Sequence, residues 1–209
     1  MSAQYNFDTE KSYRKIGLLG ASLTQQFVNH KTQEPTGYSY YLNMLLKSIY
    51  PNNYKLRKFT YPGSRFELGG WFHCQDILDF RPDLLLLELS VEDGSQKIIF
   101  GQRQRDYVHF FHILIQHNIF FGCLLLDHAL VDPKQNSLIL DICEKMKIPA
   151  QLVHQKDIES EQVRFEGVHT NAASAKSLLS AWKPFISNML RLSHFKLSWS
   201  AYSLRLPKN

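Results

Sequence analysis

The stretch Asp83-Leu84-Leu85-Leu86-Leu87-Glu88-Leu89 decides the fold of this chain. Its run of leucines is apolar on both faces of a strand, which is typical of a central strand in a parallel sheet that is covered by helices on either side. Pro82 marks the boundary before this run. We therefore expect the segment to lie in the middle of an α/β sheet.

Other short apolar runs flank this segment and alternate with longer, helix-like stretches. This alternation is typical of successive β–α–β units and of a mostly parallel sheet. The five predicted strands cover residues 15–19, 54–59, 83–89, 119–126 and 150–153. The predicted helices, in which apolar residues recur at three-to-four spacing, cover 37–49, 66–80, 96–118, 133–147 and 171–192. The sequence thus predicts a three-layer αβα sandwich that binds its ligands at the carboxyl ends of the strands.

Length and composition predict one domain with a packed core. The chain has 209 residues, of which 44% are hydrophobic and 21% are charged, which is the balance of a soluble globular protein. We expect a folded domain over residues 1–192 and a basic, aromatic-containing tail over 193–209. In this tail Phe195, Leu197 and Trp199 alternate with polar residues, a strand-like pattern. We favour packing of the tail on its own domain over binding to an anionic surface or to a partner subunit in a homo-oligomer.

The net charge of +5 is concentrated near the C-terminus. Residues 167–209 hold six of the 24 basic residues and none of the 19 acidic residues. A basic patch could bind nucleic acid, but no motif typical of nucleic-acid binding accompanies this one. We therefore expect a solvated helix face and a basic tail, and no nucleic-acid partner.

We expect neither export nor membrane insertion. Residues 1–15 lack the apolar run of a secretory signal, and the longest apolar runs, 84–87 and 119–126, are too short to span a bilayer. Cys74, Cys123 and Cys143 have no paired spacing, which indicates reduced thiols rather than disulfides or a zinc ribbon. The sequence predicts a cytoplasmic protein with no transmembrane segment.

The first predicted strand leads into Gly20-Ala21-Ser22-Leu23-Thr24, at the point where a strand passes into a helix. A serine in such a turn can expose its hydroxyl while its backbone N–H points to the same place, so that one turn supplies a nucleophile and an oxyanion donor. Judged from this segment alone, capping of the next helix is the commoner role for Ser22. The loops after the other predicted strands help to choose between the roles of nucleophile and helix cap.

Polar loops also follow the second and third predicted strands, at Tyr61-Pro62-Gly63-Ser64 and at 88–93, and Glu166-Gly167-Val168-His169 precedes the last helix. A carboxylate three residues before a histidine can reach the imidazole and fix its tautomer, while the other ring nitrogen faces a serine. Ser22, His169 and Glu166 are therefore the predicted catalytic triad.

In order and spacing, these segments resemble the motif blocks of the SGNH, or GDSL-type, hydrolase superfamily. The first block is matched by 20–24, the second by Gly63, the third by 89–93 and the last by 166–169, and the resemblance extends over about residues 15–190. The resemblance implies a flavodoxin-like αβα sandwich with five mostly parallel strands. It also implies an oxyanion hole to which Ser22 and Gly63 contribute N–H groups and in which Glu92 holds the third position.

The function that this resemblance implies is that of a serine esterase or O-acyltransferase. Ser22 would attack a small acyl ester, such as an O-acetylated carbohydrate, His169 would act as the base, and Glu166 would orient His169. No metal and no organic cofactor is implied. The competing hypothesis is a catalytically weak or inactive domain that binds a glycan or a protein partner.

Three positions depart from the family pattern. Ala21 and Glu166 stand where the family has aspartate, and Glu92 stands where it has an asparagine that donates to the oxyanion. An ionised carboxylate has no proton to donate and repels a developing anion. Glu92 must therefore either be protonated or turn away from the oxyanion, for instance toward Arg65.

Other candidate residues rank lower. His128 follows the fourth predicted strand and is the second choice for the catalytic base. His109, His112 and His117 lie on one predicted helix without a second group of ligands, so we expect surface histidines rather than a metal site. A nucleotide-binding role is disfavoured because the first turn lacks a Gly-X-Gly-X-X-Gly run.

Overall fold

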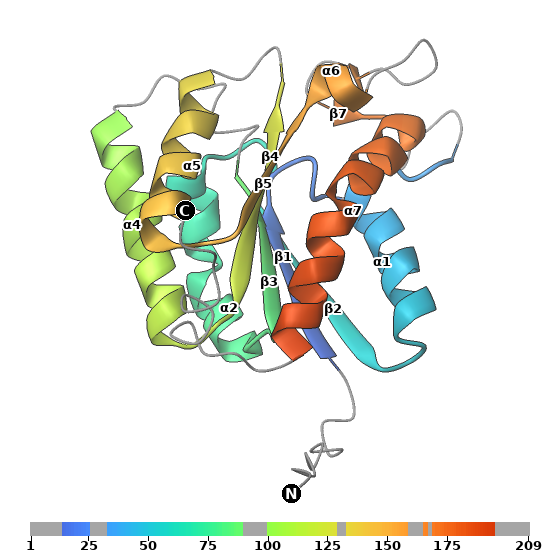
Figure 1. The fold of residues 1–209 in the computed structure, drawn as a ribbon, viewed down its shortest axis with the longest axis horizontal. Helices are drawn as coiled ribbons and strands as arrows, with labels where there is room; N and C mark the ends of the chain where they lie inside the picture. The colour runs from blue at the N-terminus through green and yellow to red at the C-terminus, as the bar shows by residue number, and fades with distance from the viewer. Residues whose placement is uncertain are drawn as a thin grey trace, which may run out of the picture.

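The structure, a computed structural model, describes residues 14–25, 33–89, 100–128, 133–158, 165–166 and 169–194. Its centre is a five-stranded sheet with helices on both faces (Figure 1). The strands are β1 (Arg14–Gly20), β2 (Tyr54–Thr60), β3 (Leu84–Glu88), β4 (Phe121–Asp127) and β5 (Ala150–His154).

All neighbouring strands of this sheet are parallel, in the order β2-β1-β3-β4-β5. This is the flavodoxin-like order, in which the chain switches direction across the sheet between β1 and β3. Ligands in such sheets bind beyond the carboxyl ends of the strands at the switch point. The structure therefore confirms the predicted αβα fold and directs attention to the loops after β1, β2 and β3.

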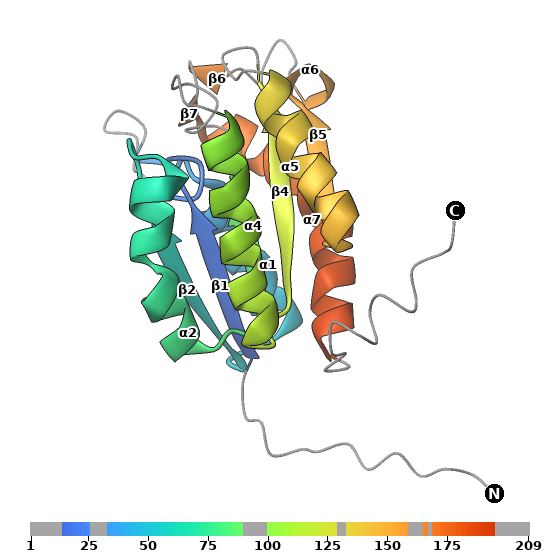
Figure 2. The same cartoon turned by 90° about the vertical axis from the view of Figure 1, so that its left-hand side faces the viewer.

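The helices form two layers. One face carries α1 (Tyr38–Ile49) and α7 (Ala172–His194), and the other carries a π-helical turn, η1 (Phe66–Gly70), with α2 (Cys74–Phe80), α4 (Phe100–Gln116) and α5 (Pro133–Met146). Figure 2 looks onto the second of these faces. Three short elements that were not predicted lie beyond the carboxyl ends of the strands, namely α6 (Gln155–Ile158), β6 (Phe165–Glu166) and β7 (His169–Thr170).

The leucine run of β3 contributes to the core on both faces of the sheet. Leu85 and Leu87 pack in the cluster under α2, α4 and α5, whereas Leu84 and Leu86 pack in the cluster under α1 and α7. All four side chains are fully buried. Because side chains alternate along a strand, Glu88 belongs to the same face as Leu84 and Leu86, which is the face covered by α1 and α7.

Three helices differ from the prediction by two residues or more, and one of them is α4, which ends at Gln116 rather than at 118. The helix predicted over 66–80 is divided into η1 and α2, because Gly69 and Gly70 allow a close approach that a side chain would block. A Cβ on Gly69 would lie 2.2 Å from the Cβ of Tyr61, and one on Gly70 would lie 2.3 Å from Cδ2 of Phe66. Helix α7 continues to His194, two residues beyond its predicted end at 192, and residues 195–209 of the predicted tail lie outside the described residues.

The cysteines are free thiols, with Cys123 and Cys143 buried and Cys74 partly buried. The Sγ atoms of Cys123 and Cys143 lie 3.6 Å apart, between β4 and α5. In the part of the chain that the structure describes, no helix has both the length and the apolar character needed to cross a bilayer.

Candidate active site

The turn after β1 holds Ser22 at the switch point of the sheet. The Ala21 carbonyl accepts hydrogen bonds from the Thr24 N–H at 3.2 Å and the Gln25 N–H at 3.1 Å, so that the chain turns tightly around Ser22. Ser22 is only 4% exposed, and its Oγ has no hydrogen-bond partner among the described residues. Buried hydroxyls nearly always have a partner, and an exception is a mark of a catalytic group or of a bound solvent or ligand.

The helix-capping alternative for Ser22 finds no support in this turn. A capping serine accepts the N–H of a residue two or three positions later. Here the N–H groups of Thr24 and Gln25 donate to the Ala21 carbonyl instead, and Ser22 Oγ accepts no N–H of a described residue. The contacts of the described residues therefore do not support a capping role for Ser22.

Gly63 lies in a turn beside the Ser22 turn. Ser64 donates its N–H to the Tyr61 carbonyl at 3.1 Å, and Pro62 and Gly63 occupy the middle positions, as in a type II turn. The φ of Gly63 is +68°, which favours glycine there, although a Cβ would have nothing within 4 Å. Tyr61 donates its N–H to the Gly20 carbonyl at 3.2 Å, which joins this turn to the end of β1.

Glu88 ends β3, which lies beside β1 on the side away from β2. It connects the strand that leads into the third block to the Ser22 turn. The register pairs Glu88 with Gly20, and the fully buried Glu88 carboxylate accepts the Ala21 N–H at 3.2 Å and the Thr24 hydroxyl at 3.4 Å. From the sequence, Glu88 was predicted only to begin the loop after the third strand. Its signal in the sequence is a single acidic residue that ends a strand made of leucines. Residues 90–99, which include Glu92, lie outside the described residues.

A polar network lies behind the end of β3. The Tyr107 hydroxyl donates to the Leu89 carbonyl at 3.5 Å and accepts from Nε2 of Gln135 at 2.9 Å, and Arg103 donates to Oε1 of Gln135 at 2.6 Å. Both Arg103 and Gln135 are buried. This network holds α4 and α5 against Leu89, the first residue of the third block and the last described residue before Glu92.

His169 and Glu166 lie opposite each other in a two-stranded antiparallel sheet. The register of β6 and β7 pairs Glu166 with His169 and Phe165 with Thr170. In Figures 1 and 2 this small sheet lies beyond the carboxyl ends of the parallel strands, on the same side of the molecule as the Ser22 turn. The structure thus places the backbones of Glu166 and His169 next to each other.

The start of α7 fixes the position of β7. The Ser174 N–H donates to Oδ1 of Asn171, and the Asn171 N–H donates to Oγ of Ser174, both at 2.9 Å. This reciprocal pair is a capping box, which defines where the helix begins. His169 therefore stands two residues before Asn171, the N-cap of α7.

The N-terminal end of α1 contacts both the Ser22 turn and β7. The Tyr38 hydroxyl lies 3.2 Å from Oγ1 of Thr24, two residues after Ser22, and the Thr170 hydroxyl donates to the Thr36 carbonyl. Thr170 directly follows His169 in the chain. Through α1, these contacts bring the first and the last motif blocks to one place.

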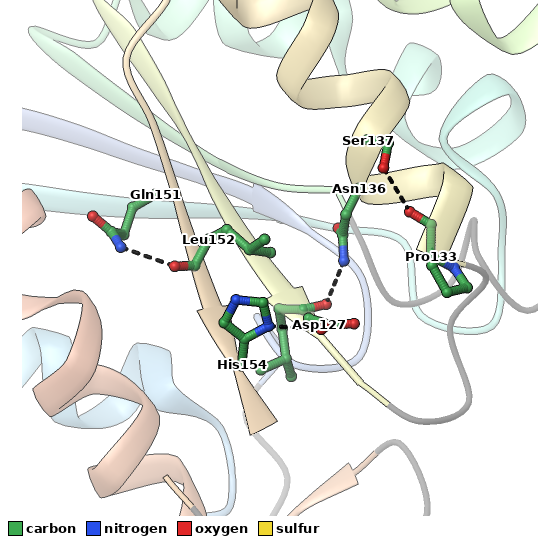
Figure 3. Close-up of polar contacts among 8 residues, drawn as sticks. Asp127, Pro133, Asn136, Ser137, Gln151, Leu152 and His154 are labelled. Carbon is green, nitrogen blue, oxygen red and sulfur yellow. Dashed lines mark hydrogen bonds and ion pairs between the residues drawn. The ribbon is translucent and has the colours of Figure 1, made fainter. Parts of the chain in front are cut away.

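Two further histidines lie at the same edge of the sheet but farther from β1. His154 at the end of β5 shares a hydrogen bond with Asp127 at the end of β4, with 2.7 Å between Nδ1 and Oδ2 (Figure 3). His128 follows β4 and is buried. Adjacent strands are about 4.8 Å apart, so β4 lies about 10 Å and β5 about 14 Å from β1. The Asp127–His154 pair was not predicted, and neither histidine comes from a strand next to Ser22.

His109 and His112 on α4, and His117 directly after it, are surface residues, as predicted. All three are exposed, and the ring centroid of His109 lies 5.2 Å from that of Trp71. Within the described ranges, no group of three or more His, Cys, Asp or Glu side chains is arranged to hold a metal ion.

No protein-family model and no curated protein matches the chain. Solved structures do match it. A psychrotrophic esterase, EstA, from Pseudoalteromonas sp. superposes with a TM-score of 0.68 at 15% identity, over 85% of this chain and 99% of that chain. A two-domain esterase active on acetylated mannans superposes with a TM-score of 0.66 at 18% identity, over 86% of this chain and 50% of that chain. A GDSL-like lipase from Bacteroides thetaiotaomicron superposes with a TM-score of 0.61 at 15% identity, over 84% of this chain and 88% of that chain.

These matches confirm the resemblance at the level of the fold. The chain has the αβα fold of the GDSL-type, or SGNH, esterases and lipases. A fold can carry several activities, so the assignment of a function depends on the residues at the site.

Proposed function

We propose that this chain is an SGNH-type serine esterase, or an O-acyltransferase with the same acyl-serine intermediate. One observation above all supports the proposal, namely the Ser22 hydroxyl that lies buried at the β1–β3 switch point with no hydrogen-bond partner among the described residues. In the same fold, EstA has been solved in a form inhibited by monoethylphosphonate. The competing hypothesis, an inactive domain that binds a glycan or a protein, has no comparable observation in its favour.

In the proposed mechanism, Ser22 Oγ attacks the ester carbonyl while the His169 imidazole takes the hydroxyl proton. The backbone N–H groups of Ser22 and Gly63 then stabilise the negative oxygen of the tetrahedral intermediate. His169 returns the proton to the departing alcohol, which leaves an acyl-serine. Water or a second alcohol attacks this ester, with His169 again as the base, and releases the acid or the new ester.

Glu166 keeps His169 in the correct orientation in this proposal. The β6–β7 register, in which Glu166 and His169 are opposite each other, supports this role. A carboxylate that accepts from one imidazole nitrogen fixes the tautomer and stabilises the imidazolium that forms during the reaction. Glutamate serves as the third member of such triads on other folds, so Glu166 is chemically sufficient.

Glu92 determines how many donors the oxyanion hole has. Two unit charges about 4 Å apart repel by about 4 kcal/mol at an effective dielectric of 20, so an ionised Glu92 beside the oxyanion would cancel much of what the N–H groups supply. Either Glu92 is protonated and donates, or it turns toward Arg65 and leaves a hole with two donors. Glu92→Asn should then raise kcat and remove any loss of activity at alkaline pH. An unchanged rate at every pH excludes Glu92 as an oxyanion donor.

The proposed substrate is a small acyl ester, such as an O-acetylated carbohydrate. The similarity to an esterase active on acetylated mannans supports this class. A panel of p-nitrophenyl esters of increasing chain length, with detection of the acyl-enzyme by intact mass, tests it directly. Highest turnover on acetate would support the small acyl group, and highest turnover on a long chain would contradict it.

The identity of the base is tested by replacing each histidine at this edge. His169→Ala should reduce turnover by about 100-fold or more, because a general base contributes that much. His128→Ala and His154→Ala should leave turnover within about threefold, since a residue that only borders the site loses no such contribution. Equal losses in His128→Ala and His169→Ala would show that the base has been misassigned.

A further inference from the structure

Glu88 is a buried acid that the proposed mechanism does not use. It ends β3, its side chain is fully buried, and its strand neighbours on the same face are Leu84 and Leu86. A carboxylate in such surroundings is unfavourable unless hydrogen-bond donors reach it. Donors on the Ser22 turn reach it, so the question is what this arrangement does for Ser22.

The Glu88 carboxylate holds the Ser22 turn on both sides of the serine. Oε2 of Glu88 accepts the backbone N–H of Ala21 at 3.2 Å and the hydroxyl of Thr24 at 3.4 Å. The first contact precedes Ser22 by one residue and the second follows it by two. Together they fix the two ends of the segment that carries the Ser22 hydroxyl and its N–H.

Tyr38 completes this arrangement from α1. Because the Thr24 hydroxyl donates its proton to Glu88, the contact of 3.2 Å between Tyr38 and Thr24 has Tyr38 as the donor. Burial, followed by the negative charge of Glu88, raises the pKa of the Tyr38 hydroxyl well above its ordinary value, so Tyr38 remains a donor. The hydrogen bonds therefore run in one direction, from Tyr38 through Thr24 to Glu88.

The strand end leaves room for these groups only because residue 20 is glycine. A Cβ on Gly20 would lie 2.1 Å from Oγ1 of Thr24 and 2.9 Å from Oε2 of Glu88. Both distances are well inside van der Waals contact. The glycine, the carboxylate and the threonine thus form one fitted unit beneath the turn.

We propose that Glu88 is a positioning residue for Ser22, which holds the Ser22 turn from β3 in a chain that has Ala21 where the family has aspartate. This inference rests on the proposed function of Ser22 as the nucleophile. The role of Glu88 is geometric: its oxygen holds Ala21 and Thr24 so that the Ser22 hydroxyl and N–H face the ester carbonyl together. Glutamine has the same shape and a carbonyl oxygen that can accept, so it should fill the role, whereas alanine cannot.

The test compares Glu88→Ala and Glu88→Gln with the control Leu86→Ala, on the same strand, the same face and one pleat away. Glu88→Ala should lower kcat by about 100-fold, because a displacement of about 1 Å at a reacting group costs that much, with KM changed by no more than about threefold. The kcat of Glu88→Gln should stay within about fivefold of the wild-type value, since the position of the turn is retained. Leu86→Ala should melt at a lower temperature but keep its kcat per folded molecule.

A second readout does not depend on activity. Amide hydrogen exchange at Ala21 should become at least about tenfold faster in Glu88→Ala, because the N–H loses its acceptor, while exchange at Leu18 in β1 should not change. If Glu88→Ala does not fold, Thr24→Val removes the second contact and the hydrogen bond from Tyr38 but keeps the first contact, at Ala21. This variant should show a smaller loss of kcat in the same direction.

Two results would overturn the proposal: unchanged protection of Ala21 in Glu88→Ala, or a loss of kcat no larger than in Leu86→Ala. A loss in Glu88→Gln equal to that in Glu88→Ala would also contradict the geometric role. If the wild type neither turns over esters nor reacts at Ser22, the proposed function fails instead. The exchange of Ala21 then still decides whether Glu88 holds the turn.

Discussion

The hydroxyl of Thr170 donates a hydrogen bond to the carbonyl of Thr36, a residue 134 positions earlier in the chain. Thr170 follows His169, and Thr36 lies just before α1, whose first residue, Tyr38, contacts the Ser22 turn through Thr24. This single contact therefore ties the strand of the proposed base to the helix that supports the proposed nucleophile.

Removal of the hydrogen bond between Thr170 and Thr36 should affect activity more than stability. Thr170→Val keeps the shape of the side chain and loses one hydrogen bond, which costs about 1 kcal/mol of folding free energy. We expect kcat to fall by about tenfold, because His169, the proposed base, is then held less firmly. Ser174→Ala, which removes part of the α7 capping box, is the control of similar cost. A kcat as high in Thr170→Val as in this control would argue against the coupling.

Gly20→Ala should destabilise the protein and slow the reaction of Ser22. The new Cβ would lie 2.1 Å from Oγ1 of Thr24, so Thr24 must move, and overpacking of this kind costs about 1–3 kcal/mol. Gly101→Ala on α4 is the matched control, because its Cβ would come no nearer than 4.0 Å to Arg105. The control should melt at or slightly above the wild-type temperature. Similar melting temperatures for both variants would contradict the close fit at Gly20.

Tyr38→Phe should reduce the loss of stability at alkaline pH. Burial raises the pKa of Tyr38, so the folded protein keeps the proton while the unfolded chain releases it near pH 10. The stabilisation is thus fully present below about pH 10 and is lost as the pH rises through the higher folded pKa. Urea denaturation between pH 8 and 11 measures this pH dependence of the free energy of unfolding. The variant should be less stable at pH 8, by about 1 kcal/mol, and should lose less stability above pH 10. If the free energy of unfolding falls equally steeply above pH 10 in the wild type and in Tyr38→Phe, the raised pKa of Tyr38 is contradicted.

The cysteines should differ in their reaction with a thiol reagent. Burial raises the pKa of Cys74 and, to a greater extent, that of Cys123, and only the thiolate reacts. In the native protein at pH 8 we expect slow modification of the partly buried Cys74 alone. Full denaturation should expose all three thiols. Rapid modification of native Cys123 or Cys143 would show that the core between β4 and α5 opens readily.

The sheet could be predicted well because the local pattern of apolar residues determines which segments form its strands. The leucines of β3 and the shorter runs beside it can be buried only as covered parallel strands, and the observed bounds differ from the predicted ones by no more than two residues. The division of the helix at Gly69 was not predicted, because it depends on contact with Tyr61, which only the folded chain supplies.

The site shows the same distinction. Ser22, Gly63 and His169 stand in or beside the motif blocks, so the sequence pattern alone is enough to propose them. Glu88 did not stand out, because its partners lie 64 to 67 residues earlier in the chain. The Asp127–His154 pair was missed for a similar reason, since β4 and β5 meet only through the register of the sheet.

The central claim is that Ser22 is the nucleophile, and a fluorophosphonate probe tests it most directly. The matched control is Ser39, a second buried serine whose Oγ also has no hydrogen-bond partner among the described residues, but which lies on α1 rather than at a strand end. We predict that the probe modifies the wild type and Ser39→Ala at Ser22 with equal stoichiometry, and that Ser22→Ala is not modified. A wild type that the probe leaves unmodified, or a Ser22→Ala variant that still reacts, would contradict the claim.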